Sequence, residues 1–161
     1  MTVTSEQPKA LPLRQVQPDG AVLLTGLAIQ FRVIVLKPGF MLLTAKGGAQ
    51  SAQDAAAERA MMREFELELE RSGMLTVFAD LRETSRFGAE TRETTVAWMR
   101  KHQARLNASH VLVRSKLIEM AITIVGMLVG GGIIKVYSRP QAFLEALQSV
   151  APRIATLPVI R

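Results

Sequence analysis

Strand-like and helix-like segments alternate strictly between Met74 and Tyr137, and this alternation constrains the fold more than any other feature. Three short apolar runs favour strands: MLTVFADL (74–81), HVLVRS (110–115) and GGGIIKVYS (130–138). The segments between them carry the apolar periodicity of helices. Such alternation is typical of parallel βαβ crossovers, which bury a sheet on both faces. The sequence therefore predicts an α/β domain.

A β-hairpin is expected ahead of this region. The runs FRVIVL (31–36) and FMLLTA (40–45) flank the turn KPG (37–39), and AVLLTGL (21–27) is a candidate strand before them. Pro presets φ at the first central position of a type II turn, and Gly accepts the positive φ that the second position requires. The hairpin makes the expected sheet a mixed one of about five strands.

The first of four expected helices has recognisable ends. Ser51 and Asp54 form a capping box that satisfies free N–H groups, and Gly73 stands where a left-handed C′ residue belongs. Apolar residues recur on its expected inner face, and glutamates mark the side expected in solvent. The two sets are Met61, Phe65 and Leu69, and Glu64, Glu66, Glu68 and Glu70.

The other three helices are expected over residues 89–107, 115–129 and 140–150. Ser138 is the expected N-cap of the last one. Pro140 lies in its first turn, where the missing N–H costs nothing.

Length and composition bound the domain count and the location. A chain of 161 residues builds one domain with a real core. We expect a flexible arm over 1–20, the domain over 21–150 and an extended tail over 151–161. The chain has no cysteine, and its first residues do not resemble a secretory signal, so a cytoplasmic location is expected.

Membranes and nucleic acids are not expected as partners. The apolar run 117–134 is interrupted by Glu119 and three consecutive glycines, whereas a membrane-spanning helix needs about 20 apolar residues. The net charge of +6 comes from scattered basic residues. Trp98 and Tyr137 alone do not build the aromatic platform on which bases stack.

Two segments carry a family resemblance: VFADLRETSRFGAETRET (77–94) and HVLVRSKLIEMAITIVGMLVGGGIIKVYSRPQAFLEAL (110–147). The first contains a strand ending in an acid and the loop into a helix. The second contains a later strand, a helix, a Tyr-Ser pair and a closing helix with its Phe. Over residues 30–148 the pattern resembles the STAS domain, the SpoIIAA-like fold of sulfate transporters and anti-sigma-factor antagonists. The resemblance implies a bacterial, non-enzymatic signalling module that docks on a protein partner, such as a kinase or an anti-sigma-like protein.

The chain departs from this family at the start of the second helix. Anti-sigma-factor antagonists carry Asp-Ser-Ser/Thr-Gly there, and the partner kinase phosphorylates its hydroxyl. Here the stretch is FGAET (87–91), with Glu90 near the place of the acceptor. The candidate acceptors that remain are Ser85, Thr91 and Thr94, unless Glu90 mimics a permanently charged state.

An alternative function is the sensing of a small ligand, a nucleotide or a lipid. Asp80 and Arg82 lie at the carboxyl end of an expected parallel strand, the edge where α/β sheets hold ligands. Gly47 and Gly48 precede the first helix, in the strand–loop–helix order of anion sites, although the spacing of a phosphate-binding loop is missing. The simpler alternative is that Asp80 caps the loop that follows it.

A docking surface is expected on the second helix. Trp98, Lys101 and Arg105 share one side of it, and an exposed Trp beside cations is typical of an interface hot spot. The alternative is that the N-terminal arm or the C-terminal tail covers the indole.

A homodimer is expected through the third helix, which is apolar nearly all round. Met120, Thr123 and Met127 fall opposite its inner face, and adaptable methionines favour binding surfaces. Coverage by the tail 151–161 is the alternative. The residues expected to face inward are Leu117, Ile118, Ala121, Ile124, Val125 and Leu128.

No catalytic residue, metal ligand or cofactor site is expected. His102 and His110 are the two histidines, and their spacing suggests neither a Ser–His–Asp relay nor a metal site. The favoured function is a non-enzymatic, protein-binding regulatory module.

Overall fold

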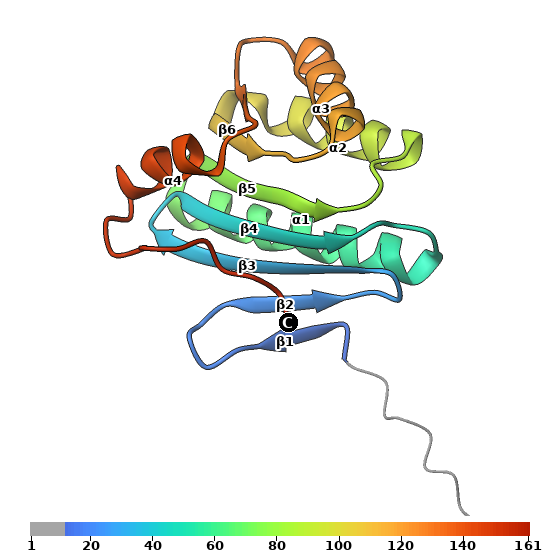
Figure 1. Cartoon of the computed structure of the whole chain (residues 1–161), viewed down its shortest axis with the longest axis horizontal. Coiled ribbons are helices and arrows are strands. Elements are labelled where there is room, and N and C mark those ends of the chain that lie inside the picture. The colour runs from blue at the N-terminus through green and yellow to red at the C-terminus, as the bar shows by residue number, and fades with distance from the viewer. Residues whose placement is uncertain (1–11) are drawn as a thin grey trace, which may run out of the picture.

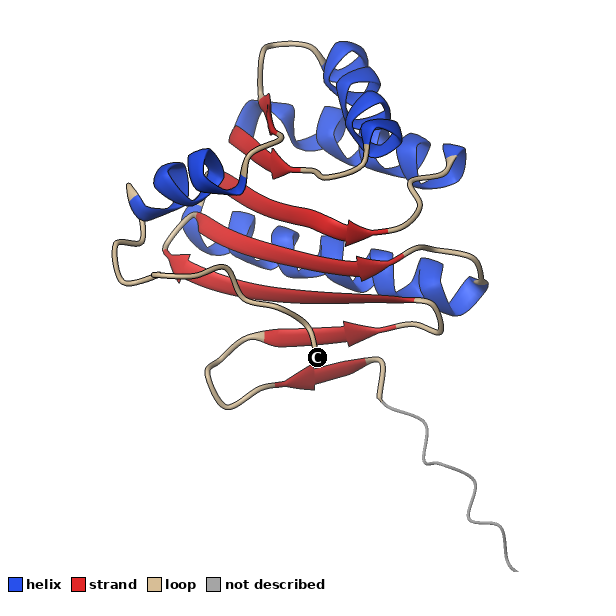
Figure 2. Cartoon of the chain, in the orientation of Figure 1, coloured by secondary structure: helices blue, strands red, loops and turns tan. Residues whose placement is uncertain are grey.

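A computed structural model describes residues 12–161, which form a seven-stranded sheet with helices on both faces (Figures 1 and 2). The strands lie side by side in the order of the sequence. They are β1 (Arg14–Val16), β2 (Val22–Thr25), β3 (Ile29–Lys37), β4 (Phe40–Gly47), β5 (Leu75–Thr84), β6 (Leu106–Leu112) and β7 (Ile134–Tyr137). The helices are α1 (Ala52–Ser72), α2 (Ala89–His102), α3 (Lys116–Val129) and α4 (Pro140–Gln148).

The direction of the strands changes at β4. Strands β1 to β4 pair antiparallel, whereas β4 to β7 pair parallel. Each parallel step is made through one helix, α1, α2 or α3, because a chain needs a crossover to re-enter a sheet in the same direction. The predicted α/β class, the mixed sheet, the N-terminal hairpin and the four helices are confirmed.

Alternating side chains of the sheet build two cores. Met41 and Leu43 of β4 pack in the larger core with α1, α2 and α3. Leu42, between them, packs in the smaller core with Phe143 and Leu147 of α4. A strand that is buried on both faces reads as a continuous apolar run, which is why β4 and β5 stand out in the sequence.

Helix α1 begins and ends as the sequence predicts. The Ser51 hydroxyl accepts a hydrogen bond from the Asp54 N–H, and Gly73 closes the helix at φ 82°. Glu68, predicted in solvent, is instead only 2% exposed. Its carboxylate accepts a hydrogen bond from the Gly39 N–H at 3.2 Å and pairs with Arg71. It therefore ties α1 to the hairpin turn.

Four local predictions differ from the structure. The sheet has seven strands rather than about five, and β1 lies inside the predicted flexible arm; residues 1–11 of that arm are outside the described residues. Helix α2 ends at His102, and β6 begins at Leu106, a residue whose apolar spacing also fits a longer helix. The N-cap of α4 is Arg139 rather than Ser138, without a side-chain hydrogen bond. The strand β1 was missed because it is three exposed residues at the sheet edge, too short for a pattern.

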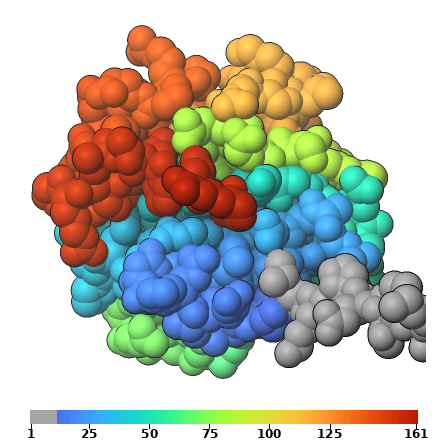
Figure 3. Space-filling model, turned by 60° about the horizontal axis from the view of Figure 1, so that its bottom comes forward, coloured from blue at the N-terminus to red at the C-terminus, as the bar shows by residue number. Residues whose placement is uncertain are grey.

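The C-terminal tail runs extended across the α4 face of the sheet (Figures 1 and 3). Arg153 donates to the Leu36 carbonyl at 3.3 Å, and the Lys46 ammonium donates to the Ile160 carbonyl at 3.4 Å. Ile154 and Leu157 pack against the smaller core. The tail therefore lies on the face of the sheet opposite to α3. Within residues 12–161, no helix has the length and apolar character to cross a membrane.

Candidate functional site

The exposed side of α3 carries several large apolar side chains. Met120 is 62% exposed and Met127 is 72% exposed, and Thr123 between them is also exposed. Leu117, 77% exposed, and Leu128, 48% exposed, extend the same side. We call these five residues the α3 stripe. The residues predicted for a dimer surface are thus brought together.

Leu117 and Leu128 were predicted to face inward, and this prediction is wrong. Helix α3 packs on α2 and on β7, the four-residue edge strand of the sheet. Because β7 is short and lies at the edge of the sheet, only one side of α3 is buried. The buried residues on that side are Ile118, Ala121, Ile122, Val125 and Val129. The sequence shows that this helix is apolar on more than one side. It does not show where the sheet ends, and therefore which apolar side is buried.

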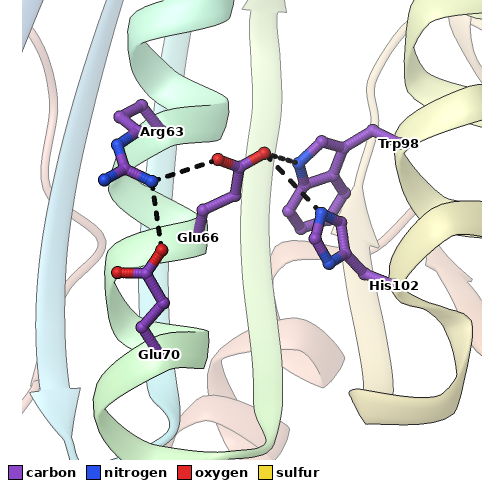
Figure 4. Close-up of polar contacts among 5 residues, drawn as sticks. All are labelled: Arg63, Glu66, Glu70, Trp98 and His102. Carbon is purple, nitrogen blue, oxygen red and sulfur yellow. Dashed lines mark hydrogen bonds and ion pairs between the residues drawn. The ribbon is translucent and has the colours of Figure 1, made fainter.

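Trp98 is half-buried between α1 and α2 (Figure 4). Its indole N–H donates to Glu66 Oε1 at 3.1 Å, and its ring lies 5.9 Å from the ring of Phe65. Arg63 pairs with the same carboxylate at 3.3 Å. Burial alone raises the pKa of Glu66, but the hydrogen bonds from Trp98 and Arg63 outweigh it, so the pKa lies below its ordinary value.

Helix α1, rather than the C-terminal tail, therefore covers one side of the indole. His102, predicted on a helix flank, is buried, and its ring centroid lies 4.6 Å from that of Trp98. Lys101 and Arg105, the other residues of the predicted docking surface, are exposed. That surface remains a prediction, with Trp98 now also part of the packing between α1 and α2.

The predicted ligand edge separates into two parts. Asp80 is 3% exposed, and the Arg82 guanidinium grips its carboxylate with two hydrogen bonds of 3.0 and 2.8 Å. Gly47 and Gly48 lie at the end of β4 against backbone and loop: a Cβ on Gly47 would lie 2.0 Å from the Ala28 carbonyl oxygen. The charge of Asp80 is therefore paired with Arg82 of the same chain. Gly47 is needed because the backbone at Ala28 leaves no room for a side chain.

The predicted phospho-acceptors differ in access. Ser85 and Thr94 are exposed. Thr91 is half-buried, and its hydroxyl donates to Glu58 Oε1 at 3.0 Å. Glu58 itself was not singled out from the sequence. Its partner is 33 positions away, and no local pattern announces such a contact.

His110, like His102, is engaged in aromatic packing. The ring of His110 stacks on Phe78 at 4.5 Å, and its Nδ1 lies 2.9 Å from the Tyr137 hydroxyl. Burial, with a smaller effect of Lys135, lowers the pKa of His110. Within residues 12–161, no group of three His, Asp or Glu side chains is arranged to hold a metal ion.

Comparisons with known proteins bear on the fold. No protein-family model and no curated protein matches the chain. The chain is similar to the crystal structure of an uncharacterised DUF3478-family protein with a SpoIIAA-like fold from Shewanella loihica PV-4. The TM-score is 0.54 and the identity 15%, over 74% of this chain and 94% of the other.

It is also similar to an anti-sigma factor antagonist from Mycobacterium paratuberculosis. Here the TM-score is 0.51 and the identity 15%, over 75% of this chain and 95% of the other. At this identity the likeness concerns the fold. The chain has a SpoIIAA-like, STAS-like fold, as the resemblance predicted.

Proposed function

We propose that this chain is a non-enzymatic regulatory module of the STAS type that binds proteins through the α3 stripe. The exposure of the stripe is the observation that carries the proposal. Met120, Met127 and Leu117 are each more than half exposed, whereas single apolar residues, not contiguous rows, are the norm on monomeric proteins. The tail, which is the alternative cover considered from the sequence, packs on the other face of the sheet.

The first partner is a second copy of this chain. Met120 and Met127 lie about two helical turns apart, with Thr123 near the middle. A two-fold axis through that point brings Met120 of one copy onto Met127 of the other, so one surface serves both partners. Lys116 and Glu119, which pair at 3.1 Å at the start of α3, supply a polar rim beside the apolar stripe.

The contacts of Asp80 and His110 support a non-enzymatic role for these two groups. Asp80 is neutralised by Arg82, and His110 is held by Phe78 and Tyr137. A general base has to reach a substrate proton, whereas each of these two side chains is held by neighbours within the chain. The neighbour described as an anti-sigma factor antagonist favours a signalling partner, such as a kinase or an anti-sigma-like protein, in the cytoplasm.

The double variant Met120→Glu, Met127→Glu tests the proposal. It places carboxylates in the stripe without touching a buried residue, and we expect a folded monomer by light scattering where the wild type is a dimer. The matched control is Leu27→Glu, Met74→Glu, because Leu27 and Met74 are also exposed but lie away from α3. A wild type that is monomeric at high micromolar concentration contradicts the dimer.

A further inference from the structure

A cavity of about 140 Å³ lies between the sheet and helices α1, α2 and α3. Its walls are mostly apolar, with Phe31 and Val77 from the sheet, Met61 and Phe65 from α1, and Met99 from α2. An engineered apolar cavity of about 150 Å³ takes up benzene. This one therefore has room for a single six-membered ring.

A few polar side chains line this mostly apolar cavity. Glu58, which lines it, is only 7% exposed. Its Oε1 accepts the hydrogen bond from Thr91, and within residues 12–161 no cation forms an ion pair with its carboxylate. Thr84, at the end of β5, also lines the cavity, and its buried Oγ1 has no hydrogen-bond partner among the described residues. Two polar groups that line the cavity, the Glu58 carboxylate on α1 and the Thr84 hydroxyl on β5, thus have unused hydrogen-bonding capacity.

A buried carboxylate without a cation is costly, and proteins keep such groups mainly where they are used. Burial raises the pKa of Glu58, and the charges of Glu90 and Asp54 add to this, whereas the Thr91 hydroxyl and the charge of Arg59 oppose it. Arg86 lines the cavity as well, but its side chain belongs to the exposed loop before α2. Solvent screens a charge in that position. Glu58 therefore has a hydrogen bond from Thr91 but no ion-pair partner among residues 12–161, which leaves its carboxylate able to pair with a cation from outside the chain.

We propose that this cavity binds a small apolar molecule that carries one ammonium group. The apolar body lies among Met61, Phe65 and Met99. The ammonium group donates hydrogen bonds to Glu58 and to the Thr84 hydroxyl, which satisfies both. A pocket with apolar walls and a few convergent polar groups is the usual form of a small-ligand site. This site is separate from the α3 stripe, and from Asp80 and Arg82 on the other face of the sheet.

The test compares three probes that share one ring and differ in charge: benzylamine, benzyl alcohol and benzoate. Each is titrated into the full-length ¹⁵N-labelled protein. We expect benzylamine to shift the amide signals of Glu58, Thr84 and Thr91 and to raise the melting temperature, because binding to the native state stabilises it. Benzyl alcohol should bind more weakly, and benzoate should have no effect. Absence of benzylamine binding, or equal binding of benzoate, overturns the proposal.

Two variants locate the site. Glu58→Gln removes the charge and should weaken benzylamine binding about tenfold, the scale of one charge-assisted hydrogen bond, with benzyl alcohol nearly unchanged. Ala79→Leu fills the cavity from β5, since Ala79 lines it, and should abolish binding of both probes. Glu93→Gln removes an exposed charge of α2 and serves as the control. Wild-type benzylamine affinity in Glu58→Gln, or in Ala79→Leu, places the probe elsewhere and overturns the site.

Discussion

The indole N–H of Trp98 donates a hydrogen bond of 3.1 Å to the carboxylate of Glu66, 32 positions earlier in the chain. This contact joins α2 to α1 across the larger core (Figure 4). It gives Trp98 a structural role beside the docking role that the sequence predicts.

Trp98→Ala should therefore lower the free energy of unfolding by about 2–3 kcal/mol, somewhat less than for a fully buried Trp. Chemical denaturation measures the loss. Lys101→Ala, an exposed neighbour on α2, should leave stability nearly unchanged. If Trp98→Ala keeps the wild-type stability, the indole belongs to an exposed docking surface after all.

Asp54 links the start of α1 to the turn between β2 and β3. Its carboxylate accepts hydrogen bonds from the Ala28 N–H at 2.8 Å and the Gln50 N–H at 2.9 Å. Burial raises the pKa of Asp54, but these hydrogen bonds, with those of Ser51 and Leu27, outweigh it and lower the pKa to about 2. Because the folded-state pKa is depressed, the stabilisation is present above the ordinary pKa of 3.8 and is lost as the pH falls toward 2.

Asp54→Ala should cost about 2–3 kcal/mol at neutral pH, since it removes the carboxylate that accepts from the Ala28 and Gln50 N–H groups and leaves these N–H groups without partners. Urea unfolding of wild type and variant across the acid range checks the pH dependence. The difference between the two proteins should shrink below pH 3.8. A difference that stays constant down to pH 2 shows that the Asp54 charge is not responsible.

Gly73 and Gly47 both have positive φ, but only Gly47 is also closely packed against other atoms. Comparing their alanine variants therefore distinguishes the cost of backbone strain from the cost of a steric clash. Gly73, at φ 82°, has no atom within 4 Å of an added Cβ, so Gly73→Ala should cost about 1 kcal/mol from the left-handed conformation alone. Gly47, at φ 89°, would place that Cβ 2.0 Å from the Ala28 carbonyl oxygen. Gly47→Ala should therefore destabilise the protein by clearly more than Gly73→Ala. Equal melting temperatures for the two variants contradict the packing role of Gly47.

The candidate phospho-acceptors lead to a prediction about modification. We expect no phosphate in protein purified from its host, because Glu90 stands near the place of the family's acceptor and the Thr91 hydroxyl is held by Glu58. Intact-mass measurement tests this. Phosphate on Ser85 or Thr94, which are exposed, restores the switch of the STAS family; phosphate on Thr91 also contradicts the persistence of its contact with Glu58.

Local signals explain which parts of this fold could be predicted. The ends of α1 depend on Ser51, Asp54 and Gly73, which act within one helical turn of where they stand, and both ends were predicted correctly. The glycine cluster after α3 likewise closes the helix with positive φ at Gly130. Continuous apolar runs were enough to predict the central strands β3, β4 and β5.

Long-range contacts explain what was missed. Glu68 looks like a solvated glutamate until the hairpin turn brings the Gly39 N–H to it, 29 positions away. Glu58 looks equally ordinary until the sheet and α2 close a cavity around it. Leu117 and Leu128 are exposed because the sheet ends at β7. The spacing of apolar residues in α3 does not show where the sheet ends.

The dimer through α3 is tested most directly by a cross-link at its two-fold axis. The chain has no cysteine, so Thr123→Cys introduces a single thiol at the centre of the α3 stripe. Under mild oxidation we expect Thr123→Cys to form a covalent dimer, seen by intact mass, whereas the control Ser149→Cys, exposed just after α4, stays monomeric. A Thr123→Cys protein that stays monomeric, or one that cross-links no faster than Ser149→Cys, contradicts the α3 interface.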